Sequence, residues 1–153
     1  MISFSSKKFD ELSTVELYEI LALRAEVFVV EQNCPYQDVD GKDPFSIHVL
    51  GYIEDKMVAY ARVLEKGISY PNYASIGRIV TSPFVRGKKY GHALVDFSIR
   101  VCRKNYPAQT IKISAQAQLE KFYRQHSFVS TGEPYLEDNI PHIGMIYTSK
   151  DEL

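Results

Sequence analysis

A basic segment that contains two glycines is the part of this sequence best suited to binding an anion. Residues 83–93 read Pro-Phe-Val-Arg-Gly-Lys-Lys-Tyr-Gly-His-Ala, between a run with strand character and a helical pattern. The first turn of a helix presents unpaired N–H groups and the positive end of the helix dipole, so it attracts phosphate. Gly87 and Gly91 allow close backbone approach, and Arg86, Lys88 and Lys89 add positive charge. The segment is neither a P-loop nor a dinucleotide fingerprint, and a glycine-containing turn with a solvated basic rim is the alternative.

Helical and strand patterns indicate how this segment is positioned. Ser13 to Glu16 form a capping box, and apolar residues at helical spacing follow as far as Phe28, before Pro35. A second helix is expected from the glycines to about residue 104, and a third over 119–126. Strands are expected over residues 47–53, 57–64, 74–81, 110–114, 129–131 and 142–148, the last two flanking a proline-bounded loop. With one more strand before the first helix, to which no residues are assigned, the element order β, α, β, β, β, α, β, α, β, β predicts a mixed α/β (α+β) layer in which helices pack on a sheet.

Composition limits the class of protein. With 153 residues, 45% hydrophobic and 24% charged, the chain is expected to form a single domain over residues 1–153. A net charge of −1 gives no reason to expect nucleic acid or an anionic membrane as partner, and no apolar run reaches the roughly 18 residues of a membrane span. The histidines and the two cysteines lack the paired spacing of a metal site, so no metal is expected.

The expected location is cytoplasmic. Cys34 and Cys102 are too few for a disulfide framework and are expected to be free thiols. The N-terminus lacks the apolar core of a signal peptide. The last four residues, 150–153, spell the ER-retention signal Lys-Asp-Glu-Leu, which we interpret as a coincidence because nothing directs the chain into the secretory pathway.

A family resemblance extends over nearly the whole sequence. Arg86-Gly87-x-x-Tyr90-Gly91 resembles the pyrophosphate loop of the GNAT N-acyltransferases, Q/R-x-x-G-x-G/A. The chain is similar to the ElaA-type branch of that superfamily in residues 23–36, 40–43, 76–80, 115–119, 122–123, 132–138 and 140–143. Two residues depart from the pattern: Lys89 replaces the central glycine of the motif, and Ser127 stands where a glycine is expected before Phe128. If Lys89 takes a positive φ, the loop is strained by roughly 1 kcal/mol and cofactor binding is expected to be weakened but not lost.

The resemblance implies a fold and a co-substrate. The fold would be a central, mostly antiparallel sheet that splays between two central strands, with helices on both faces. Acetyl-CoA would lie in that gap, with its pantetheine arm pairing like a strand with the backbone of Ile79, Val80 and Thr81. Its phosphates would meet the loop from Arg86 to His92, and Gln116 stands where many relatives carry an asparagine. The implied cofactor-binding residues are Ile79, Val80, Thr81, Arg86, Gly87, Lys88, Lys89, Tyr90, Gly91, His92 and Gln116.

The implied reaction is N-acetyl transfer to a primary amine by direct attack in a ternary complex. Tyr123 matches the family tyrosine that returns a proton to the departing thiolate, and without the family it would be an aromatic residue at the core edge. The general base is left open, since water could carry the proton. Candidate acceptor-binding residues are Glu31, His48, Glu133, Asp138 and His142, each of which could instead be a structural hydrogen-bonding group. Arg24 and Arg78 are expected to form ion pairs.

Charge is distributed unevenly along the chain. Residues 86–104 hold six basic residues and one acid, whereas residues 31–43 hold four acids and one lysine, and residues 133–138 hold three acids. If both acidic segments border the acceptor, the expected partner is a small-molecule or peptide amine of cationic character. Solvated turn charges are the other interpretation.

Two rival functions and the oligomeric state stay open. A non-catalytic acyl-CoA-binding regulatory module is suggested by Lys89. An acyltransferase resembling the acyl-homoserine-lactone synthases is suggested by Arg24, Phe28 and Glu31. The sequence also leaves a homodimer open.

Overall fold

The computed structural model describes residues 1–149, so the retention-like signal at residues 150–153 lies outside the described residues. Strands β1 (Ser3–Lys8), β2 (Ser46–Ile53), β3 (Lys56–Leu64) and β4 (Ser75–Thr81) form one antiparallel sheet in that order. Strands β5 (Lys112–Gln116), β7 (Ile140–Tyr147) and β6 (Phe128–Glu137) form a second antiparallel sheet with β7 in the middle. The helices are α1 (Thr14–Arg24), α2 (Tyr90–Asn105) and α3 (Glu120–Arg124). This order of helices and strands confirms the predicted one.

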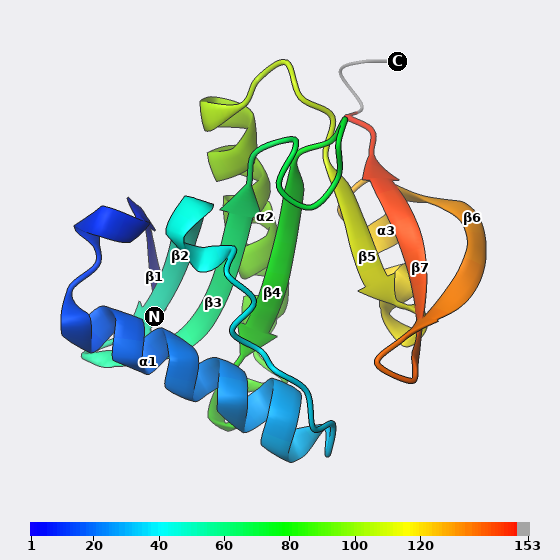
Figure 1. The fold of residues 1–153 in the computed structure, drawn as a ribbon. Helices are drawn as coiled ribbons and strands as arrows, with labels where there is room; N and C mark the ends of the chain where they lie inside the picture. The colour runs from blue at the N-terminus through cyan, green and yellow to red at the C-terminus, as the bar shows by residue number, and fades with distance from the viewer. Residues whose placement is uncertain (150–153) are drawn as a thin grey trace.

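Helices lie on both faces of the β1–β4 sheet, and α3 lies behind the β5–β7–β6 sheet (Figure 1). On one face, α1 and its wider π-helical continuation, Ala25–Glu31, form a hydrophobic cluster with β2, β3 and β4. This cluster consists of Ile20, Leu23, Val27, Leu50, Met57, Tyr60 and Val80. On the other face, α2 packs Leu94, Val95 and Ile99 into a larger cluster that includes residues of both sheets, such as Val49 and Met145. The fold is therefore the mixed α/β arrangement that the sequence predicts.

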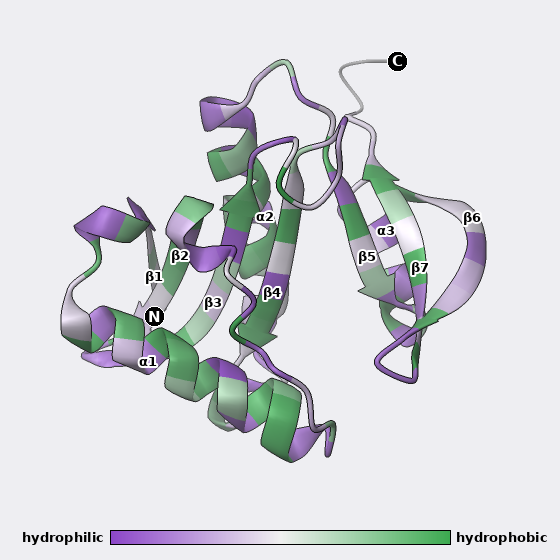
Figure 2. Cartoon of the chain, in the orientation of Figure 1, coloured by the Kyte–Doolittle hydropathy of each residue, from purple (hydrophilic) through white to green (hydrophobic). Residues whose placement is uncertain are grey.

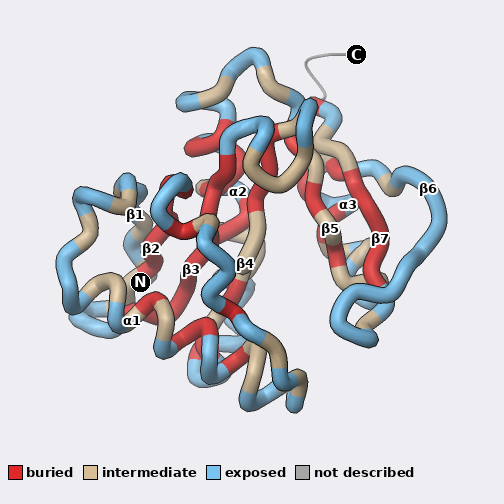
Figure 3. Tube along the Cα trace, viewed as in Figure 1, coloured by how far each residue is buried: buried red, intermediate tan, exposed pale blue. Residues whose placement is uncertain are grey.

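Burial follows this arrangement. Strands β2 and β3 are buried along most of their length, and Figure 3 shows them in red. Figure 2 shows hydrophobic residues along the same strands, whereas the segment that leaves α1 is largely hydrophilic. Strand β6 is exposed over most of its length because it is an edge strand, with only β7 beside it. Within residues 1–149, no helix is long and apolar enough to cross a membrane.

The two sheets meet at one point and then separate. Ala74 and Ile111 form an isolated parallel bridge, in which the Ala74 N–H donates to the Thr110 carbonyl (2.9 Å) and the Lys112 N–H to the Ala74 carbonyl (2.8 Å). Beyond this bridge, β4 and β5 share no strand pairing within residues 1–149. In Figure 1, β4 (green) and β5 (yellow) diverge from their first residues toward their last. This is the expected splay between two central strands.

The prediction of a loop between residues 131 and 142 is wrong. The structure continues both strands through it, so β6 and β7 form a long hairpin whose turn residues, Asp138 and Asn139, have φ of 50° and 64°. Two consecutive positive φ values are typical of the tight turns that join antiparallel strands. Pro134 lies in a register shift of β6, and edge strands tolerate proline at bulges because the missing N–H breaks no internal ladder bond.

A buried ion-pair network fixes the segment after α1. Arg24 is fully buried and donates to Asp38 (2.7 Å) and Asp43 (2.8 Å), and Arg62 of β3 donates to Asp43 (2.9 Å) and pairs with Asp40. Burial raises the pKa of Asp43, but hydrogen bonds and charge from Arg24 and Arg62 outweigh burial and lower it. Arg24 therefore forms ion pairs, as expected. Arg78 also pairs with Asp38 and Asp40, so three arginines balance the three aspartates, which weakens the expectation that residues 31–43 present an acidic surface.

Candidate active site

A cavity of about 150 Å³ lies in the gap between β4 and β5. One wall is β4 from Ile76 to Ile79, and the opposite wall is β5 from Ile113 to Gln116. The segment after α1 contributes Phe28, Gln32, Cys34 and Tyr36, and the β6–β7 hairpin contributes Glu137, Asp138, Ile140 and His142. Leu119 and Tyr123 complete the lining. The cavity therefore joins five segments that are far apart in the sequence, and it is the candidate active site.

Tyr123 is a buried, protonated phenol in this cavity. Its side chain is 7% exposed, and burial raises its pKa to about 12. Its ring stands edge-on to Phe122 (5.1 Å between centroids) and Phe128 (6.0 Å), which fixes the ring plane. Among the described residues its hydroxyl has no hydrogen-bond partner. A phenol of this kind is available to donate its proton to a group inside the cavity.

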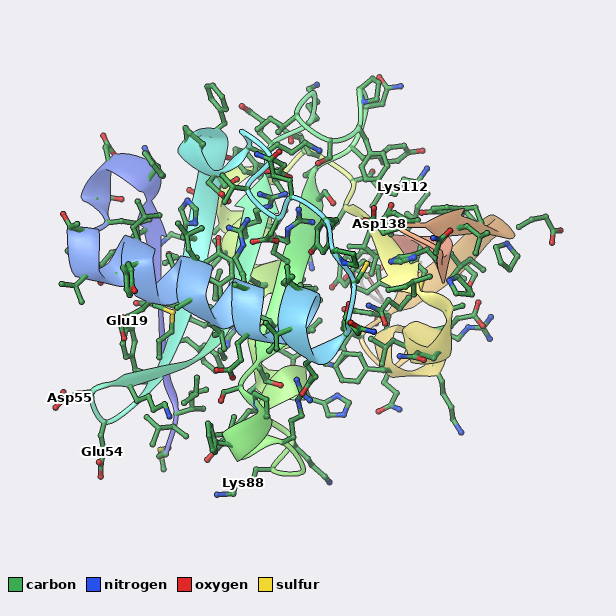
Figure 4. The ribbon with its side chains drawn as sticks, turned by 60° about the horizontal axis from the view of Figure 1, so that its bottom comes forward. Glu19, Glu54, Asp55, Lys88, Lys112 and Asp138 are labelled. Carbon is green, nitrogen blue, oxygen red and sulfur yellow. The ribbon has the colours of Figure 1, made fainter. Side chains whose placement is uncertain are left out.

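The hairpin side of the cavity carries an imidazole and two carboxylates. His142 is 8% exposed, and its Nδ1 lies 2.7 Å from the Ile140 carbonyl. The Nε2 atom of His142 lies 3.5 Å from Glu137 Oε2. The Ser114 hydroxyl of β5 donates to the other Glu137 oxygen (3.3 Å) and bonds the Tyr135 hydroxyl. Asp138 is in the turn of the same hairpin, and Figure 4 shows it close to the segment that follows α1, where the Cys34 thiol donates to the Asp138 carbonyl (3.7 Å).

The strand-edge residues lie where a ligand could pair with them. Ile79 lines the cavity, while the Val80 side chain packs under α1 and leaves only its backbone for pairing. The Thr81 carbonyl accepts a 3.3 Å hydrogen bond from Arg86. Gln116 lines the opposite wall, and its amide oxygen accepts from Gln118 (3.2 Å).

The start of α2 lacks a capping side chain. Helix α1 begins with a complete capping box, in which Ser13 accepts from the Glu16 N–H and Glu16 accepts from the Ser13 N–H. The N-cap of α2 is Lys89, whose side chain makes no such bond. The first amides of a helix have no partner inside the helix, so those of Tyr90, Gly91 and His92 are available to an external acceptor. Lys89 has a φ of 62° and Gly87 a φ of 84°, so the condition for a strained Lys89 is met.

The side chains around this helix start have different partners. Lys88 is exposed and points away from the body of the protein (Figure 4). His92 Nδ1 lies 2.8 Å from His126 Nε2, and His126 Nδ1 lies 2.8 Å from Asp96, so this chain of hydrogen bonds ties α2 to the end of α3. The spacing of these residues in the sequence gave no sign of the His92–His126–Asp96 hydrogen bonds. The side chain of His92 is thus held by His126, and its backbone N–H, in the first turn of α2, has no partner inside the helix.

Glu31 lies beside the basic loop. Its carboxylate pairs with Arg86 at 2.7 Å, and the two side chains are 38% and 43% exposed. The hydrogen bond from Arg86 lowers the pKa of Glu31. Arg86 therefore holds the Glu31 carboxylate beside the basic loop, and Glu31 does not line the cavity in which an acceptor was expected.

Two other predicted acceptor residues lie outside the cavity. His48 is fully buried in β2, with Nδ1 2.6 Å from the Tyr60 hydroxyl and Nε2 2.9 Å from the Asp43 carbonyl. Burial lowers the pKa of His48, so it is a structural hydrogen-bonding group. Glu133 is exposed in the register shift of β6 and does not line the cavity. Of the predicted acceptor residues, the structure brings Asp138 and His142 together in the cavity.

Sequence reasoning missed several residues of the cavity. Arg78 of β4 forms the expected ion pair, with Asp38 (2.8 Å), but its place in the cavity lining and its φ of 47° were not expected. Tyr36 and Glu137 were not singled out, because their segments carried only loop signals. Cys34 and Cys102 are both free, as expected, and Cys34 lines the cavity. Within residues 1–149, no three His, Cys, Asp or Glu side chains are grouped so that they could hold a metal ion.

Comparisons with known proteins give consistent results. Residues 16–149 match the family model of an acetyltransferase (GNAT) domain. The chain is 43% identical to protein ElaA of Escherichia coli (strain K12) over 95% of each chain. The crystal structure of Escherichia coli ElaA aligns with a TM-score of 0.90, covering 97% of this chain and 100% of that one at 41% identity. An acyl-CoA N-acyltransferase from Pseudomonas aeruginosa aligns with a TM-score of 0.91 and 38% identity, with the same coverage.

A more distant structure shares the fold alone. A CoA-dependent acyl-homoserine lactone synthase aligns with a TM-score of 0.79, covering 99% of this chain and 86% of that one, at 15% identity. This likeness does not distinguish between acyl-transfer reactions.

Proposed function

The chain belongs to the GNAT acetyltransferase family, and from that premise we propose that it transfers an acetyl group from acetyl-CoA to a primary amine by direct attack in a ternary complex. The observation that carries the proposal is the cavity between β4 and β5, which combines a free strand edge with the buried phenol of Tyr123, whose hydroxyl has no hydrogen-bond partner among the described residues.

The residues around the gap fit an acyl-CoA. The free edge of β4 at Ile79, Val80 and Thr81 can pair with the amides of the pantetheine arm. The uncapped amides at the start of α2 and the side chains of residues 86, 88 and 89 can meet its phosphates. Gln116 can reach the arm from the β5 wall. When bound there, acetyl-CoA supplies an activated thioester at the cavity.

The proposed chemistry uses Tyr123 as the general acid. The amine nitrogen attacks the thioester carbonyl carbon, so a C–N bond forms and the C–S bond breaks. Tyr123 gives its proton to the departing sulfur, and the proton released by the amine nitrogen restores the phenol. A pKa near 12 keeps Tyr123 protonated at neutral pH, so the acid is in its active form before the reaction.

The proposed acceptor is a cationic amine. Glu137 and Asp138 line the acceptor side, whereas the cationic Arg78 is matched by Asp38 and Asp40. The two carboxylates therefore leave this wall negative, which favours an ammonium group over a carboxylate-bearing amine. We expect spermidine, an aminoglycoside and a lysine-containing peptide to give higher kcat/KM than glutamate or aspartate, with kcat/KM falling as salt rises. Equal rates for anionic amines would reject this selectivity.

The substitution Tyr123→Phe tests the proposal. It removes one hydroxyl and keeps the ring, so kcat should fall about a hundredfold while the affinity for acetyl-CoA stays nearly unchanged. Tyr73→Phe removes a hydroxyl outside the cavity and is the matched control, with kcat expected unchanged. Wild-type kcat in Tyr123→Phe would reject the general-acid role. Protein that binds acetyl-CoA but releases no thiol with any amine would favour the non-catalytic binding module. Faster turnover with long acyl donors would favour a reaction like that of the acyl-homoserine-lactone synthases.

A further inference from the structure

We propose that His142 is the general base that removes the proton from the acceptor ammonium, and that Glu137 positions it; this inference rests on the proposed acetyl transfer. His142 lies in β7, opposite Gln116 of β5 and Tyr135 of β6, so strands on both sides fix its backbone. Its ring lines the cavity that Tyr123 also lines. The cavity thus contains one group that donates a proton and one that accepts a proton.

The hydrogen bond of Nδ1 determines which nitrogen is basic. A carbonyl oxygen can only accept, so the 2.7 Å contact with the Ile140 carbonyl requires the proton of the neutral ring to lie on Nδ1. The lone pair of the neutral ring then lies on Nε2. Ile140 belongs to the same strand as His142, so the bond is set by the backbone at the hairpin turn. The ring is also stacked on Tyr135, with 6.3 Å between centroids and 25° between planes.

Glu137 favours the charged form that proton transfer creates. Its Oε2 atom lies 3.5 Å from Nε2, and Ser114 holds its other oxygen at 3.3 Å. Once Nε2 has taken a proton, this carboxylate stabilises the imidazolium by charge. The titratable and charged groups that face His142 from the surrounding walls, besides Tyr123, are Cys34, Tyr36, Arg78, Tyr135, Glu137 and Asp138. Of these, Glu137 is the group whose distance to Nε2 is that of an ion pair.

Neither neighbouring carboxylate is as well suited to be the base. Carboxylates ordinarily lose their protons near pH ~4, which makes them weak acceptors for the proton of an alkylammonium. Imidazole exchanges its proton close to neutral pH, where a general base is most effective. The Glu137 side chain is 51% exposed, whereas that of His142 is 10% exposed and faces the cavity.

The protons of the reaction balance through these groups. His142 takes one proton from the ammonium, and the neutral amine attacks the thioester carbonyl carbon. Tyr123 gives one proton to the sulfur as the C–S bond breaks, and the second amine proton restores the phenol. His142 then passes its proton to solvent, so each turnover yields one amide, one thiol and one released proton.

The substitution His142→Asn separates the base from the structural hydrogen bond. The asparagine amide nitrogen can occupy the place of Nδ1 and donate to the Ile140 carbonyl, but the side chain ends short of Nε2. With acetyl-CoA and spermidine, we expect kcat/KM at neutral pH to fall about a hundredfold, with the loss shrinking as the pH rises and the amine deprotonates unaided. The affinity for acetyl-CoA and the thermal midpoint should stay close to wild type. In Glu137→Gln, kcat should fall while the KM for acetyl-CoA stays close to wild type, because the imidazolium formed in the reaction loses its carboxylate.

The outcomes distinguish this inference from the function on which it rests. A His142→Asn enzyme with the wild-type pH profile, or one lowered equally at every pH, overturns the role of His142 and leaves the acetyltransferase proposal standing. Wild-type protein that binds acetyl-CoA but acetylates neither spermidine nor a lysine-containing peptide overturns both. A ¹⁵N-histidine spectrum of the free protein, assigned with His142→Asn, should show the His142 proton on Nδ1. Finding that proton on Nε2 would overturn the inference whatever the turnover.

Discussion

Removal of the Glu31 carboxylate should tighten the binding of CoA. Arg86 is the first basic residue after the end of β4, but Glu31 already occupies one of its Nη atoms at 2.7 Å. A phosphate oxygen that binds this guanidinium must share it with Glu31 or displace it. Glu31→Gln takes away the negative charge and keeps the size of the side chain, so Arg86 becomes free for phosphate.

The exposure of the pair limits the size of this effect. Both side chains are more than one third exposed, and ion pairs in that setting contribute about 0–1 kcal/mol because water screens them. Loss of the whole competing interaction therefore tightens CoA by at most about fivefold. Arg86→Ala should weaken CoA, and in the Arg86→Ala background Glu31→Gln should have almost no further effect, because its influence passes through Arg86.

Calorimetric titration with CoA, at low and at high salt, of wild type, Glu31→Gln, Arg86→Ala and the double variant measures the coupling between Glu31 and Arg86. Glu26→Gln is the matched control, since Glu26 lies in the same helical segment but forms no ion pair with any described residue. Equal affinities of Glu31→Gln and wild type, or a full effect of Glu31→Gln without Arg86, would refute the coupling. Unchanged affinity in Arg86→Ala would remove Arg86 from the CoA site.

Two further predictions concern stability. Lys89→Gly and Ser127→Gly each place glycine at a positive φ (62° and 71°), so each should raise the free energy of unfolding, measured by urea titration, by about 1 kcal/mol. Gly87→Ala places a side chain at a φ of 84° and should lower the free energy of unfolding. A lower free energy of unfolding in Lys89→Gly would contradict the argument that Lys89 is strained. The pKa of Asp43 is lower in the folded than in the unfolded chain, so its ion pairs stabilise the fold above about pH 4 and this stability is lost as the pH falls further. Asp43→Asn should lower the free energy of unfolding by about 3–5 kcal/mol and flatten its dependence on acid pH, whereas Asp55→Asn in the exposed β2–β3 turn (Figure 4) should leave that dependence unchanged. If the free energy of unfolding of Asp43→Asn depended on acid pH as steeply as that of wild type, other groups would be responsible.

The sequence predicted the order of helices and strands because each has a local signal. The capping box at Ser13 marks the start of α1, and the glycines at 87 and 91 mark the start of α2. The β6–β7 hairpin was missed because Gly132, Pro134 and Pro141 are strong loop signals, and an edge strand with a bulge can accommodate such residues.

Site residues were harder to predict than the fold. Tyr123 and His142 line the cavity, whereas His48 lies outside it, because β2 is buried on both faces and His48 hydrogen-bonds to Tyr60 and the Asp43 carbonyl there. The pairing of Glu31 with Arg86 joins residues 55 positions apart, and no local pattern reports such a contact. The contacts among Ser114, Glu137 and His142 could not be predicted for the same reason, because Ser114 is far from Glu137 and His142 in the sequence.

The single bridge between Ala74 and Ile111 has a consequence for how a ligand can enter. Paired strands lie about 4.8 Å apart because their hydrogen bonds fix the spacing. Beyond the Ala74–Ile111 bridge, β4 and β5 are instead held together by a hydrophobic cluster in which side chains of both sheets pack against α2. The proposed pantetheine arm would therefore enter between them without breaking a hydrogen bond between protein strands, and it would connect the two sheets. Amide hydrogen exchange along β4 should slow on binding, so that the ligand itself acts as the missing strand.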